Sequence, residues 1–557
     1  MKPKYLFFIL VLFISVSVIA QLNEVQTQKI DKLFSKWTEA NHPGGVVGIM
    51  KNGEVIYSKA FGLASLEYQI ANTTETIFNT GSISKQFTAM GIVLLHQKGL
   101  LSVDDDIRKH LPDIPDFGHT ITIRHMLHHT SGMRSLHAML GLAGWRDDDS
   151  RTNEDLYRFM LNQKELNFIP GEEYLYCNTG YMLMVNIIEK VTNEKFPKWM
   201  KANIFEPLGM SDTYVEDLYS RVVLNNATSY YKRNNDFFRA VEYWGYVGSG
   251  NMHSTVKDLL TWSSYFSTPN LKWSAAFEML KTTDKLNDGS VNNYAFGVSL
   301  DEVNGYKRIQ HGGAIGGFRS YSSTYPEKQL SIAVLTNFSA SNAGQKEYQI
   351  ANILLKEKSI KKTKEDKPKV AMPIIQMSSK QLKKFEASYW NDKENYVRKI
   401  YVKNDTLHYF RSINSENLLV PISLNEFKML GITANLIAKF DVDKNGYKTM
   451  SVSVDESSPS RFVSFDPMLD SKELIKDYTG RFYSPELENI FDILIRDEKL
   501  VAHHSRHGDF PIQIIKSDVL EIPGYATIKF ERGKNNKISG IRISNGRARN
   551  VWFVKQK

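Results

Sequence analysis

The chain changes character at a short lysine-rich segment, and that change limits the folds it can adopt. Residues 356–369 hold seven lysines against three acidic residues, together with Pro368. A charge run with proline is typical of a solvated linker, so we predict a linker over residues 356–377. Helix and strand patterns alternate before it, whereas short strand patterns dominate after it. At 557 residues the chain is too long for one core, and two to four domains are expected.

Residues 21–355 predict an α/β (α+β) region in which helices and antiparallel strands are interleaved. Residues 45–50 and 54–58 have strand composition around Asn52-Gly53, which is a hairpin signal. A late run of antiparallel strands beside helices favours one sheet flanked by helices. The other predicted elements are helices over residues 82–98, 180–192 and 255–266, and strands over residues 294–300, 308–311, 319–325 and 330–337.

The region after the linker contains an internal repeat, with copies over residues 378–468 and 469–557. Lys380-Gln381-Leu382 ahead of Tyr389-Trp390 in the first copy is echoed by Lys472-Glu473-Leu474 ahead of Phe482-Tyr483 in the second. Each copy continues with paired strand patterns and few helices. We therefore predict two small antiparallel β-barrel-like repeats, the alternative being chance similarity between two β-rich sequences.

The N-terminus has the pattern of an export signal. Two lysines precede an apolar run over residues 5–20, and Val18 and Ala20 are small enough for cleavage before Gln21. An uncleaved anchor is the alternative, but the run is shorter than the roughly 20 residues that a spanning helix needs. We therefore predict a signal peptide over residues 1–20, a periplasmic or secreted protein, and no stable membrane insertion after cleavage.

Composition also restricts the partners of the chain. The formal net charge of +9 is spread along the sequence, and no basic helix alternates with aromatic residues, so nucleic acid is not an expected partner. Attraction to an acidic surface such as a cell envelope stays open. Cys177 is the only cysteine, which excludes an intrachain disulfide. If its neighbours Tyr176 and Asn178 face a substrate cleft from an extended segment, the Cys177 side chain points away from that cleft. We therefore expect it to be a small buried side chain.

A serine three residues ahead of a lysine stands at the start of a predicted helix. Ser82 and Lys85 share one helix face at that spacing, where the amine can take the proton of the weakly nucleophilic hydroxyl. The same spacing recurs at Ser254 and Ser359, so by itself it is weak evidence. Two further catalytic elements follow the Ser82–Lys85 copy along the chain. They distinguish it from the copies at Ser254 and Ser359.

The first of these elements, Tyr176-Cys177-Asn178, adds a second proton acceptor and an amide. Under the hypothesis of acyl transfer, Ser82 attacks a carbonyl carbon, and either neutral Lys85 or deprotonated Tyr176 accepts its proton. The two groups are expected to titrate together, so the sequence leaves the base open. Asn178 can hold the substrate amide or fix the Lys85 ammonium. N–H groups at the helix N-terminus under Ser82 supply half of an oxyanion hole.

The second element, His311-Gly312-Gly313-Ala314, places a polar residue before small ones on a strand predicted at the edge of the sheet. Gly312 and Gly313 let a substrate backbone approach closely. The Ala314 N–H is the candidate for the second oxyanion donor, and His311 can donate to a substrate carboxylate or assist proton transfer. A strand-end histidine before a glycine turn is the structural alternative for His311.

Together the motifs resemble those of the serine β-lactamase and penicillin-binding protein superfamily, in particular its class C-like branch. The resemblance covers residues 25–355. It implies a β-lactamase/transpeptidase-like fold with an all-helical subdomain, Ser82 as nucleophile, Lys85 and Tyr176 as the base pair, and Asn178 as a positioning residue. The segments that carry it are FNTGSISKQFT (78–88), ITIRHMLHHTSG (121–132), PGEEYLYCNTGY (170–181), PLGMSDT (207–213) and GSGNMHS (248–254).

The His311-Gly312-Gly313 element, which is the third catalytic motif along the chain, departs from the family pattern. Typical members carry lysine-threonine-glycine where this chain has His311-Gly312-Gly313, which instead resembles D-aminopeptidase-like and esterase-like members. A lysine there favours substrate carboxylates, including those of β-lactams, and histidine weakens that expectation. The two C-terminal repeats also resemble the D-aminopeptidase arrangement, although lipocalin-like appendages with no catalytic role are an alternative.

We therefore predict an exported serine hydrolase that forms an acyl-enzyme on Ser82 and cleaves a small peptide or amide, of D-amino-acid or cell-wall peptide type. Esterase or weak class C-like β-lactamase activity are the enzyme alternatives, and a penicillin- or peptide-binding sensor without turnover is an alternative of another class. Neither a metal nor a cofactor is expected, because no glutamate completes a zinc-hydrolase pattern around the histidines His125, His128 and His129. The oligomeric state is left open.

Overall fold

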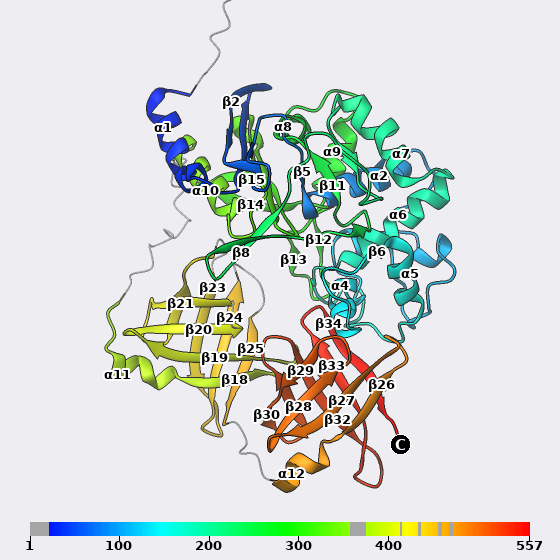
Figure 1. The fold of residues 1–557 in the computed structure, drawn as a ribbon, viewed down its shortest axis with the longest axis vertical. Helices are drawn as coiled ribbons and strands as arrows, with labels where there is room; N and C mark the ends of the chain where they lie inside the picture. Colours follow the sequence, from blue (N-terminus) through cyan, green and yellow to red (C-terminus); the bar gives the residue numbers. More distant parts are fainter. Residues whose placement is uncertain (1–21, 357–374, 413–414, 433–435, 455–458, 467–471) are drawn as a thin grey trace, which may run out of the picture.

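The computed structural model describes residues 22–356, 375–412, 415–432, 436–454, 459–466 and 472–557. The predicted signal peptide and most of the predicted linker lie outside these residues. A mixed helix-and-sheet part stands above two barrel-like sheets (Figure 1). The predicted fold class, an antiparallel sheet flanked by helices and followed by two β-barrel-like repeats, is confirmed.

The central sheet has six strands in the order β14-β15-β16-β17-β1-β2, all paired antiparallel. The predicted turn between β1 and β2 is present, and Asn52 and Gly53 have φ values of 53° and 82°, as a tight hairpin turn requires. The strands are β1 (Gly45–Lys51), β2 (Glu54–Phe61), β14 (Ser299–Val303), β15 (Tyr306–Ile315), β16 (Phe318–Tyr325) and β17 (Leu330–Thr336).

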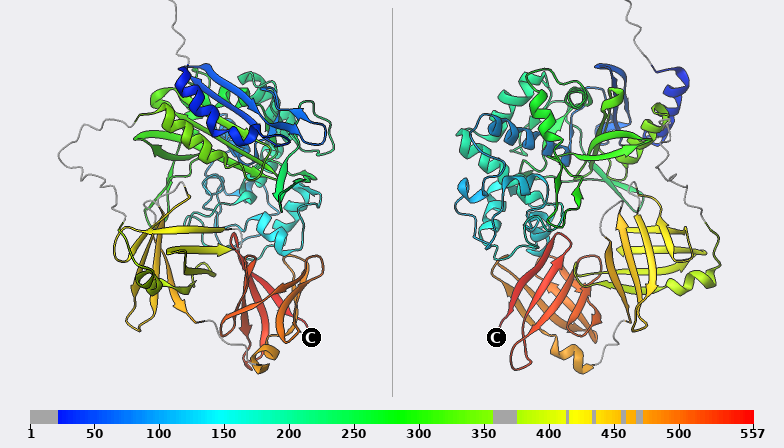
Figure 2. Two further views of the ribbon diagram at one scale, coloured as in Figure 1. Left: turned by 60° about the vertical axis from the view of Figure 1, so that its left-hand side comes forward. Right: turned by 180° about the vertical axis from the view of Figure 1, so that it is seen from behind.

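Both faces of this sheet are covered, so alternate side chains of one strand enter different cores. Val46 packs in the larger apolar cluster and its neighbour Val47 in the smaller one. Helix α8 (Val256–Ser264) lies against one face, and α1 (Glu24–Leu33) and α10 (Ala343–Leu354) lie on the other (Figure 2). The sheet is thereby fixed between two helical layers, and the strand that carries the third motif is fixed with it.

Helix α2 (Ser84–Gln97) follows Ser82 and runs through the middle of the helical layer. Its residues at helical spacing, Phe87 and Met90 among them, are buried against α6 and α9. A single turn of 3₁₀-helix over Gly81–Ile83 precedes it, so Ser82 lies one turn ahead of the α-helix. The other helices of the layer are α3 (Ile123–Leu127), α4 (Leu136–Leu142), α5 (Asn153–Leu161), α6 (Asn178–Thr192), α7 (Phe196–Met200) and α9 (Ser274–Leu280).

One predicted strand is wrong. Residues 294–300 were expected to be extended, but β14 begins only at Ser299. Gly297 has a φ of 77°, which breaks the extended backbone, and a Cβ there would lie 2.8 Å from the Gln86 backbone. Tyr294, ahead of this turn, is buried, and its hydroxyl lies 2.9 Å from His311 Nε2.

The two C-terminal repeats each begin with a short helix, α11 (Ser379–Leu382) and α12 (Lys472–Asp477). The first forms a closed barrel of β18 (Ala387–Asn391), β19 (Tyr396–Lys403), β20 (Thr406–Ser412), β21 (Ser415–Pro421), β22 (Glu426–Met429), β23 (Leu436–Val442), β24 (Lys448–Val454) and β25 (Ser460–Phe465). The second forms a nine-stranded sheet of β26 (Gly480–Ser484), β27 (Asn489–Arg496), β28 (Lys499–His504), β29 (Gly508–Pro511), β30 (Gln513–Lys516), β31 (Val519–Ile522), β32 (Ala526–Arg532), β33 (Ile538–Asn545) and β34 (Ala548–Lys555). Its edge strands, β29 and β30, are consecutive in the chain, so the sheet is nearly closed.

The second barrel-like sheet packs directly on the helical layer. Strands β33 and β34 lie beside α4 (Figure 1), and one apolar cluster runs through both parts. Arg134 and Glu486 form a buried ion pair of 2.5 Å across the junction. This packing places the turn between β33 and β34 close to the cleft. Among the described residues, no helix is long and apolar enough to cross a membrane.

Candidate active site

Ser82 and Lys85 meet as the sequence predicts. Lys85 Nζ lies 3.2 Å from Ser82 Oγ and donates a second hydrogen bond to the Ser249 carbonyl at 2.7 Å. The Ser254–Lys257 spacing has a different geometry, because Ser254 ends strand β11 (Met252–Ser254) while Lys257 lies exposed on α8. Only the first of these two therefore places a lysine amine beside a serine hydroxyl.

Burial sets the protonation of Lys85. Its side chain has no exposed surface, and desolvation, with a smaller contribution from the positive charge of Arg547, holds the pKa of Lys85 well below its usual range. The amine lies 4.8 Å from the centroid of the Tyr176 ring and 5.6 Å from that of Tyr181. A lysine held neutral beside a serine hydroxyl can accept its proton.

Tyr176 and Asn178 line the same cleft, Tyr176 just ahead of α6 and Asn178 as its first residue. Burial raises the pKa of the Tyr176 phenol, which the neighbouring Ser82 hydroxyl only partly opposes. The phenol therefore stays protonated and is a proton donor rather than a base. The Tyr176 hydroxyl and Asn178 Oδ1 are buried, and neither has a hydrogen-bond partner in the described part of the chain. Buried polar atoms are seldom left unpaired unless a ligand or water completes them.

The strand that bears Ala314 packs tightly against the turn that bears Ser82. Gly81 has a φ of 54°, and a Cβ there would lie 2.7 Å from the Ala314 nitrogen. A Cβ on Gly313 would lie 2.0 Å from the Thr80 carbonyl oxygen. Glycine at both positions therefore brings the Ala314 amide next to the Ser82 turn, where an oxyanion donor is needed.

The predicted edge position of this strand is wrong for the strand as a whole. β15 is the second strand of the sheet, because β14 pairs with it from Tyr306 to Gln310. That pairing ends before His311, whereas pairing with β16 continues to Ile315. Within residues 22–356, the half of β15 that carries the third motif thus has a strand on one side only, and its other side borders the cleft.

His311 is held by the protein at both ring nitrogens. Its Nδ1 lies 2.6 Å from the Gly312 carbonyl oxygen, which only accepts, so Nδ1 carries the proton. Nε2 then accepts from the Tyr294 hydroxyl at 2.9 Å. Burial, together with the nearby Lys85, lowers the pKa of His311 to about 3. The imidazole is therefore neutral and contributes no positive charge to the cleft.

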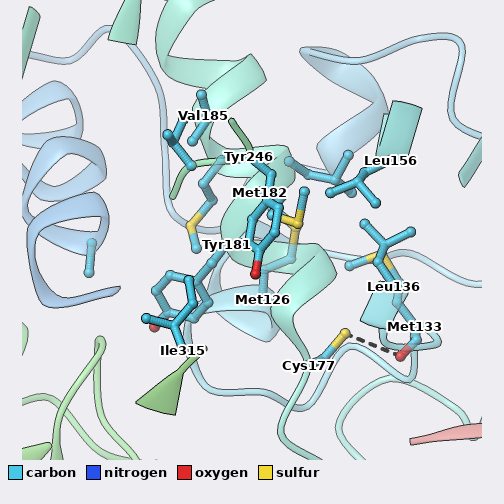
Figure 3. Packing of buried hydrophobic residues seen from close by; sticks show 14 of the residues in the cluster. Met126, Met133, Leu136, Leu156, Cys177, Tyr181, Met182, Val185, Tyr246 and Ile315 are labelled. Carbon is cyan, nitrogen blue, oxygen red and sulfur yellow. Dashed lines mark hydrogen bonds between the residues drawn. The ribbon is translucent and has the colours of Figure 1, made fainter. Parts of the chain in front are cut away.

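Cys177 is buried behind the site, as predicted. Its thiol donates to the Met133 carbonyl at 3.3 Å and points into the cluster around Met126 and Met182 (Figure 3). Its backbone N–H donates to His129 Nδ1 at 3.1 Å. The side chains on either side of Cys177 face the cleft, as expected for an extended segment.

A cavity of about 990 Å³ opens in front of Ser82. Sequence analysis missed several of the residues around it. The His129 ring is tilted against that of Tyr176, with 4.2 Å between ring centroids, and the Ser249 carbonyl accepts from Lys85. Arg319 comes from β16, and Arg547 comes from the second barrel-like sheet. The lining is formed by Ser82, Tyr174, Leu175, Tyr176, Asn178, His311, Gly312, Gly313, Ala314, Arg319, Ser320, Tyr321, Ser339, Ala340, Asn342, Ala343, Gly344, Gln345 and Arg547.

Comparison with known proteins agrees with this geometry. The family model described as Beta-lactamase matches residues 22–355, more than half of the chain. The chain belongs to the β-lactamase family. The resemblance that the motifs predict is thus confirmed at the level of the family, and it covers the helix-and-sheet part that holds Ser82 and His311.

Two relatives and one solved structure illustrate the match. Penicillin-binding protein 4* of Bacillus subtilis (strain 168) is 28% identical over 334 residues, which cover 57% of this chain and 73% of that protein. A D-aminopeptidase of Cereibacter sphaeroides (strain ATCC 17029 / ATH 2.4.9) is 28% identical over 306 residues, 54% of this chain and 57% of the relative. The octameric penicillin-binding protein homologue from Pyrococcus abyssi has a TM-score of 0.54 and 26% identity, covering 79% of this chain and all (100%) of that one.

Proposed function

We propose that the chain hydrolyses an amide bond through an acyl-enzyme on Ser82. The observation that carries this proposal is the 3.2 Å contact between Lys85 Nζ and Ser82 Oγ, made by a lysine without exposed surface. Neutral Lys85 takes the hydroxyl proton as Ser82 Oγ forms a bond to the carbonyl carbon. The lysine ammonium so formed is stabilised by the Ser249 carbonyl and by the face of the Tyr176 ring.

Tyr176 completes the proton transfer in this proposal. When the tetrahedral intermediate collapses, the carbon–nitrogen bond breaks and the leaving amine takes a proton from the Tyr176 hydroxyl, which Lys85 replaces. Water then attacks the acyl carbon, gives its proton to the same pair, and Ser82 regains its hydrogen as the acid leaves. The backbone N–H groups of Ser82 and Ala314 hold the oxyanion in both steps. Asn178 Oδ1 accepts from a substrate N–H.

The substrate we propose is a small peptide or amide of D-amino-acid or cell-wall peptide type. Relatives named D-aminopeptidase support an amide, although the match spans only 57% of the first of them. An esterase or a weak β-lactamase would use the same residues. A penicillin- or peptide-binding sensor differs from all of these in one measurable respect, because its Ser82 adduct would persist.

Intact-mass spectrometry with a fluorophosphonate and with a penicillin tests the nucleophile. A single adduct on the wild-type chain that is absent from Ser82→Ala is the expected result. No adduct, or one that survives the substitution, contradicts the proposal. Turnover of D-alanine anilides, D-alanyl-D-alanine peptides, short acyl esters and nitrocefin then separates the activities. An adduct that outlasts hours of incubation with every compound would identify a sensor.

We also propose that the protein is exported. Support comes from the basic start, the apolar run and the small residues before Gln21, all of which lie outside the described residues. N-terminal sequencing of protein recovered from the cell envelope and the medium should begin at Gln21. Recovery of only the uncleaved chain from the cytoplasm would contradict export.

A further inference from the structure

The cleft in front of Ser82 carries positive charge that its own lining does not neutralise. Of the described residues that line it, Arg319 and Arg547 are arginines and none is an aspartate or glutamate. Neither of the other basic groups adds charge, because His311 is neutral and Lys85 is held neutral by burial. The positive charge of the cleft therefore comes from guanidinium groups alone.

Arg547 is the freer of the two arginines. Arg319 is half-buried, and its Nη1 already donates to the carbonyls of Gly316 at 3.0 Å and Phe318 at 2.6 Å. The Arg547 guanidinium is exposed and lies 4.8 Å from the centroid of the Tyr176 ring. Within the described ranges, no carboxylate pairs with it.

Nearby arginines of the same sheet are paired. Arg549 pairs with Glu173 at 3.0 Å, and Arg542 with Glu165 at 2.8 Å, both across the junction with the helical layer. These arginines hold the sheet in place, whereas Arg547, on the turn between β33 and β34, lies beside Tyr176 with no ion-pair partner among the described residues. The positive charge of Arg547 is thus not explained by an ion pair that anchors the sheet to the helical layer.

The backbone at Arg547 is held at the rim of the cleft. The Arg547 carbonyl accepts from the Ser135 N–H at 2.9 Å and from Asn167 Nδ2 at 3.1 Å. The two donors come from the helical layer, so the turn is fixed to the part of the chain that carries Ser82. An arginine whose backbone is fixed loses less freedom on binding a ligand.

We propose that Arg547 binds a carboxylate of the substrate, so that the site takes amides, peptides or esters that carry a negative charge near the bond to be cleaved. A guanidinium matches a carboxylate with two parallel hydrogen bonds. The carboxylate belongs either to the leaving group or to the acyl group. A free, protonated amine at the same place is repelled. The nature of the cleaved bond rests on the function proposed above, whereas the binding of the carboxylate does not.

The test measures binding without turnover, in the full chain carrying Ser82→Ala. Isothermal titration calorimetry compares two matched pairs of ligands. N-acetyl-D-alanyl-D-alanine against its C-terminal amide probes a carboxylate on the leaving group. N-succinyl-D-alaninamide against N-butyryl-D-alaninamide probes one on the acyl group. At low salt, the carboxylate member of one pair is expected to bind at least about fivefold tighter, and the difference shrinks as NaCl rises.

Second-site variants assign the effect to Arg547. Added to Ser82→Ala, Arg547→Gln should abolish the preference and Arg547→Lys should retain part of it, because lysine keeps the charge without the planar pair of donors. Lys534→Gln is the matched control, since it removes one exposed positive charge from the turn at the opposite end of β33. This control should leave the preference unchanged.

The outcomes separate the two proposals. Equal affinities within both pairs, no binding of any of the four ligands, or a preference that survives Arg547→Gln overturns the role of Arg547. A preference that Arg547→Gln abolishes, in a chain whose wild type forms no Ser82 adduct, supports carboxylate binding and contradicts the acyl-enzyme. A thermal melt of each variant checks that the fold is intact, and the Arg547→Lys variant answers the question should Arg547→Gln unfold.

Discussion

At the scale of single residues, the most unusual group is a lysine that the protein buries completely. The folded chain prefers neutral Lys85, whereas the unfolded chain protonates it below the ordinary pKa of 10.5. Folding must then release a proton, so the presence of Lys85 lowers stability, and lowers it further as the pH falls. Such a cost is expected where a group serves catalysis rather than folding.

Lys85→Met should therefore abolish turnover and yet stabilise the fold. At pH 7 we expect a gain in the free energy of unfolding of at least about 1 kcal/mol. The gain should shrink as the pH rises toward 10.5, where the unfolded lysine also becomes neutral, by at most about 1.4 kcal/mol for each pH unit. Denaturant melts at several pH values measure it. Lys98→Met, at the exposed C-terminal end of the same helix, is the control and should show no such trend.

Cys177 lies between Tyr176 and Asn178 but faces away from the cleft. In contrast to Lys85, its substitution should therefore change stability and leave turnover nearly intact. Cys177→Ala should keep turnover within a few-fold of wild type and cost about 1 kcal/mol of stability for the small cavity it leaves. The native thiol should resist thiol reagents until the chain is unfolded. A loss of turnover of more than 100-fold, in a variant that still melts like the wild type, would show that the thiol takes part in the chemistry.

The residues that the sequence revealed are those that stand in short motifs. Ser82 and Lys85 are one helical turn apart, and Tyr176 and Asn178 frame a buried cysteine, so spacing alone placed each pair on one face. Ser249 stands in the segment at residues 248–254 that carries the family resemblance, but nothing there marks its carbonyl as a partner of Lys85, and Arg547 carries no local signal. One contributes only its backbone carbonyl, and the other lies on a hairpin turn more than 450 residues along the chain from Ser82. Only the tertiary fold brings them into the site.

At the scale of elements, the site depends on how closely strand β15 approaches the turn before α2. Gly313→Ala would place a Cβ 2.0 Å from the Thr80 carbonyl oxygen and 2.2 Å from Ser320 Oγ. Because Thr80 lies two residues before Ser82, the strand must move away from Ser82, and the Ala314 N–H moves with it. Loss of an oxyanion donor costs about 100-fold or more in turnover, and overpacking costs about 1–3 kcal/mol.

Gly312→Ala is the matched control for that change. It adds the same methyl group one residue earlier in the strand, but the nearest atom is a Tyr321 ring carbon at 3.2 Å, on a side chain that can shift. We expect kcat to fall far less for Gly312→Ala than for Gly313→Ala, as measured on the same substrate. Equal losses would mean that the close approach of the two backbones does not govern the chemistry.

The elements themselves were largely predictable, and the exceptions have physical causes. Strands β1 and β2 and helix α6 follow from alternation, helical spacing and the Asn52-Gly53 turn. The strand predicted over residues 294–300 fails because Gly297 takes a positive φ and lies too close to the Gln86 backbone for a Cβ, a contact invisible in the sequence. The edge position of β15 fails for a related reason, because strand order depends on pairings that spacing does not encode.

At the scale of the whole molecule, the second barrel-like sheet contributes to the cleft in front of Ser82 through the turn that bears Arg547. The internal repeat predicts two similar sheets, yet it cannot show that, among the described residues, the second sheet contributes to the cleft lining and the first does not. That asymmetry arises at the junction, where Arg134 and Glu486 are 352 positions apart in the chain. Arg134 also donates to the Arg549 and Asn550 carbonyls on the strand that follows the Arg547 turn.

This junction leads to the prediction with the widest consequence. Arg134 and Glu486 have 0% and 2% of their side-chain surfaces exposed, so Arg134→Met leaves a buried carboxylate without its partner. The expected cost is about 3–5 kcal/mol, seen as an earlier thermal transition. Because the same arginine holds the strand after the Arg547 turn, turnover of carboxylate-bearing substrates should fall more than that of neutral ones.

Two variants sharpen the interpretation of that result. Arg506→Gln breaks an ion pair with Asp149 across the same junction, but its side chains are 43% and 21% exposed, so we expect a cost below about 1 kcal/mol. Arg134→Met combined with Glu486→Leu removes both buried charges and should recover most of the lost stability. If Arg134→Met melts no earlier than Arg506→Gln, the buried pair does not hold the sheet in place. The position of Arg547 beside Tyr176 must then rest on the other contacts of the junction, among them the shared apolar cluster, the Ser135 and Asn167 hydrogen bonds and the Arg549–Glu173 ion pair.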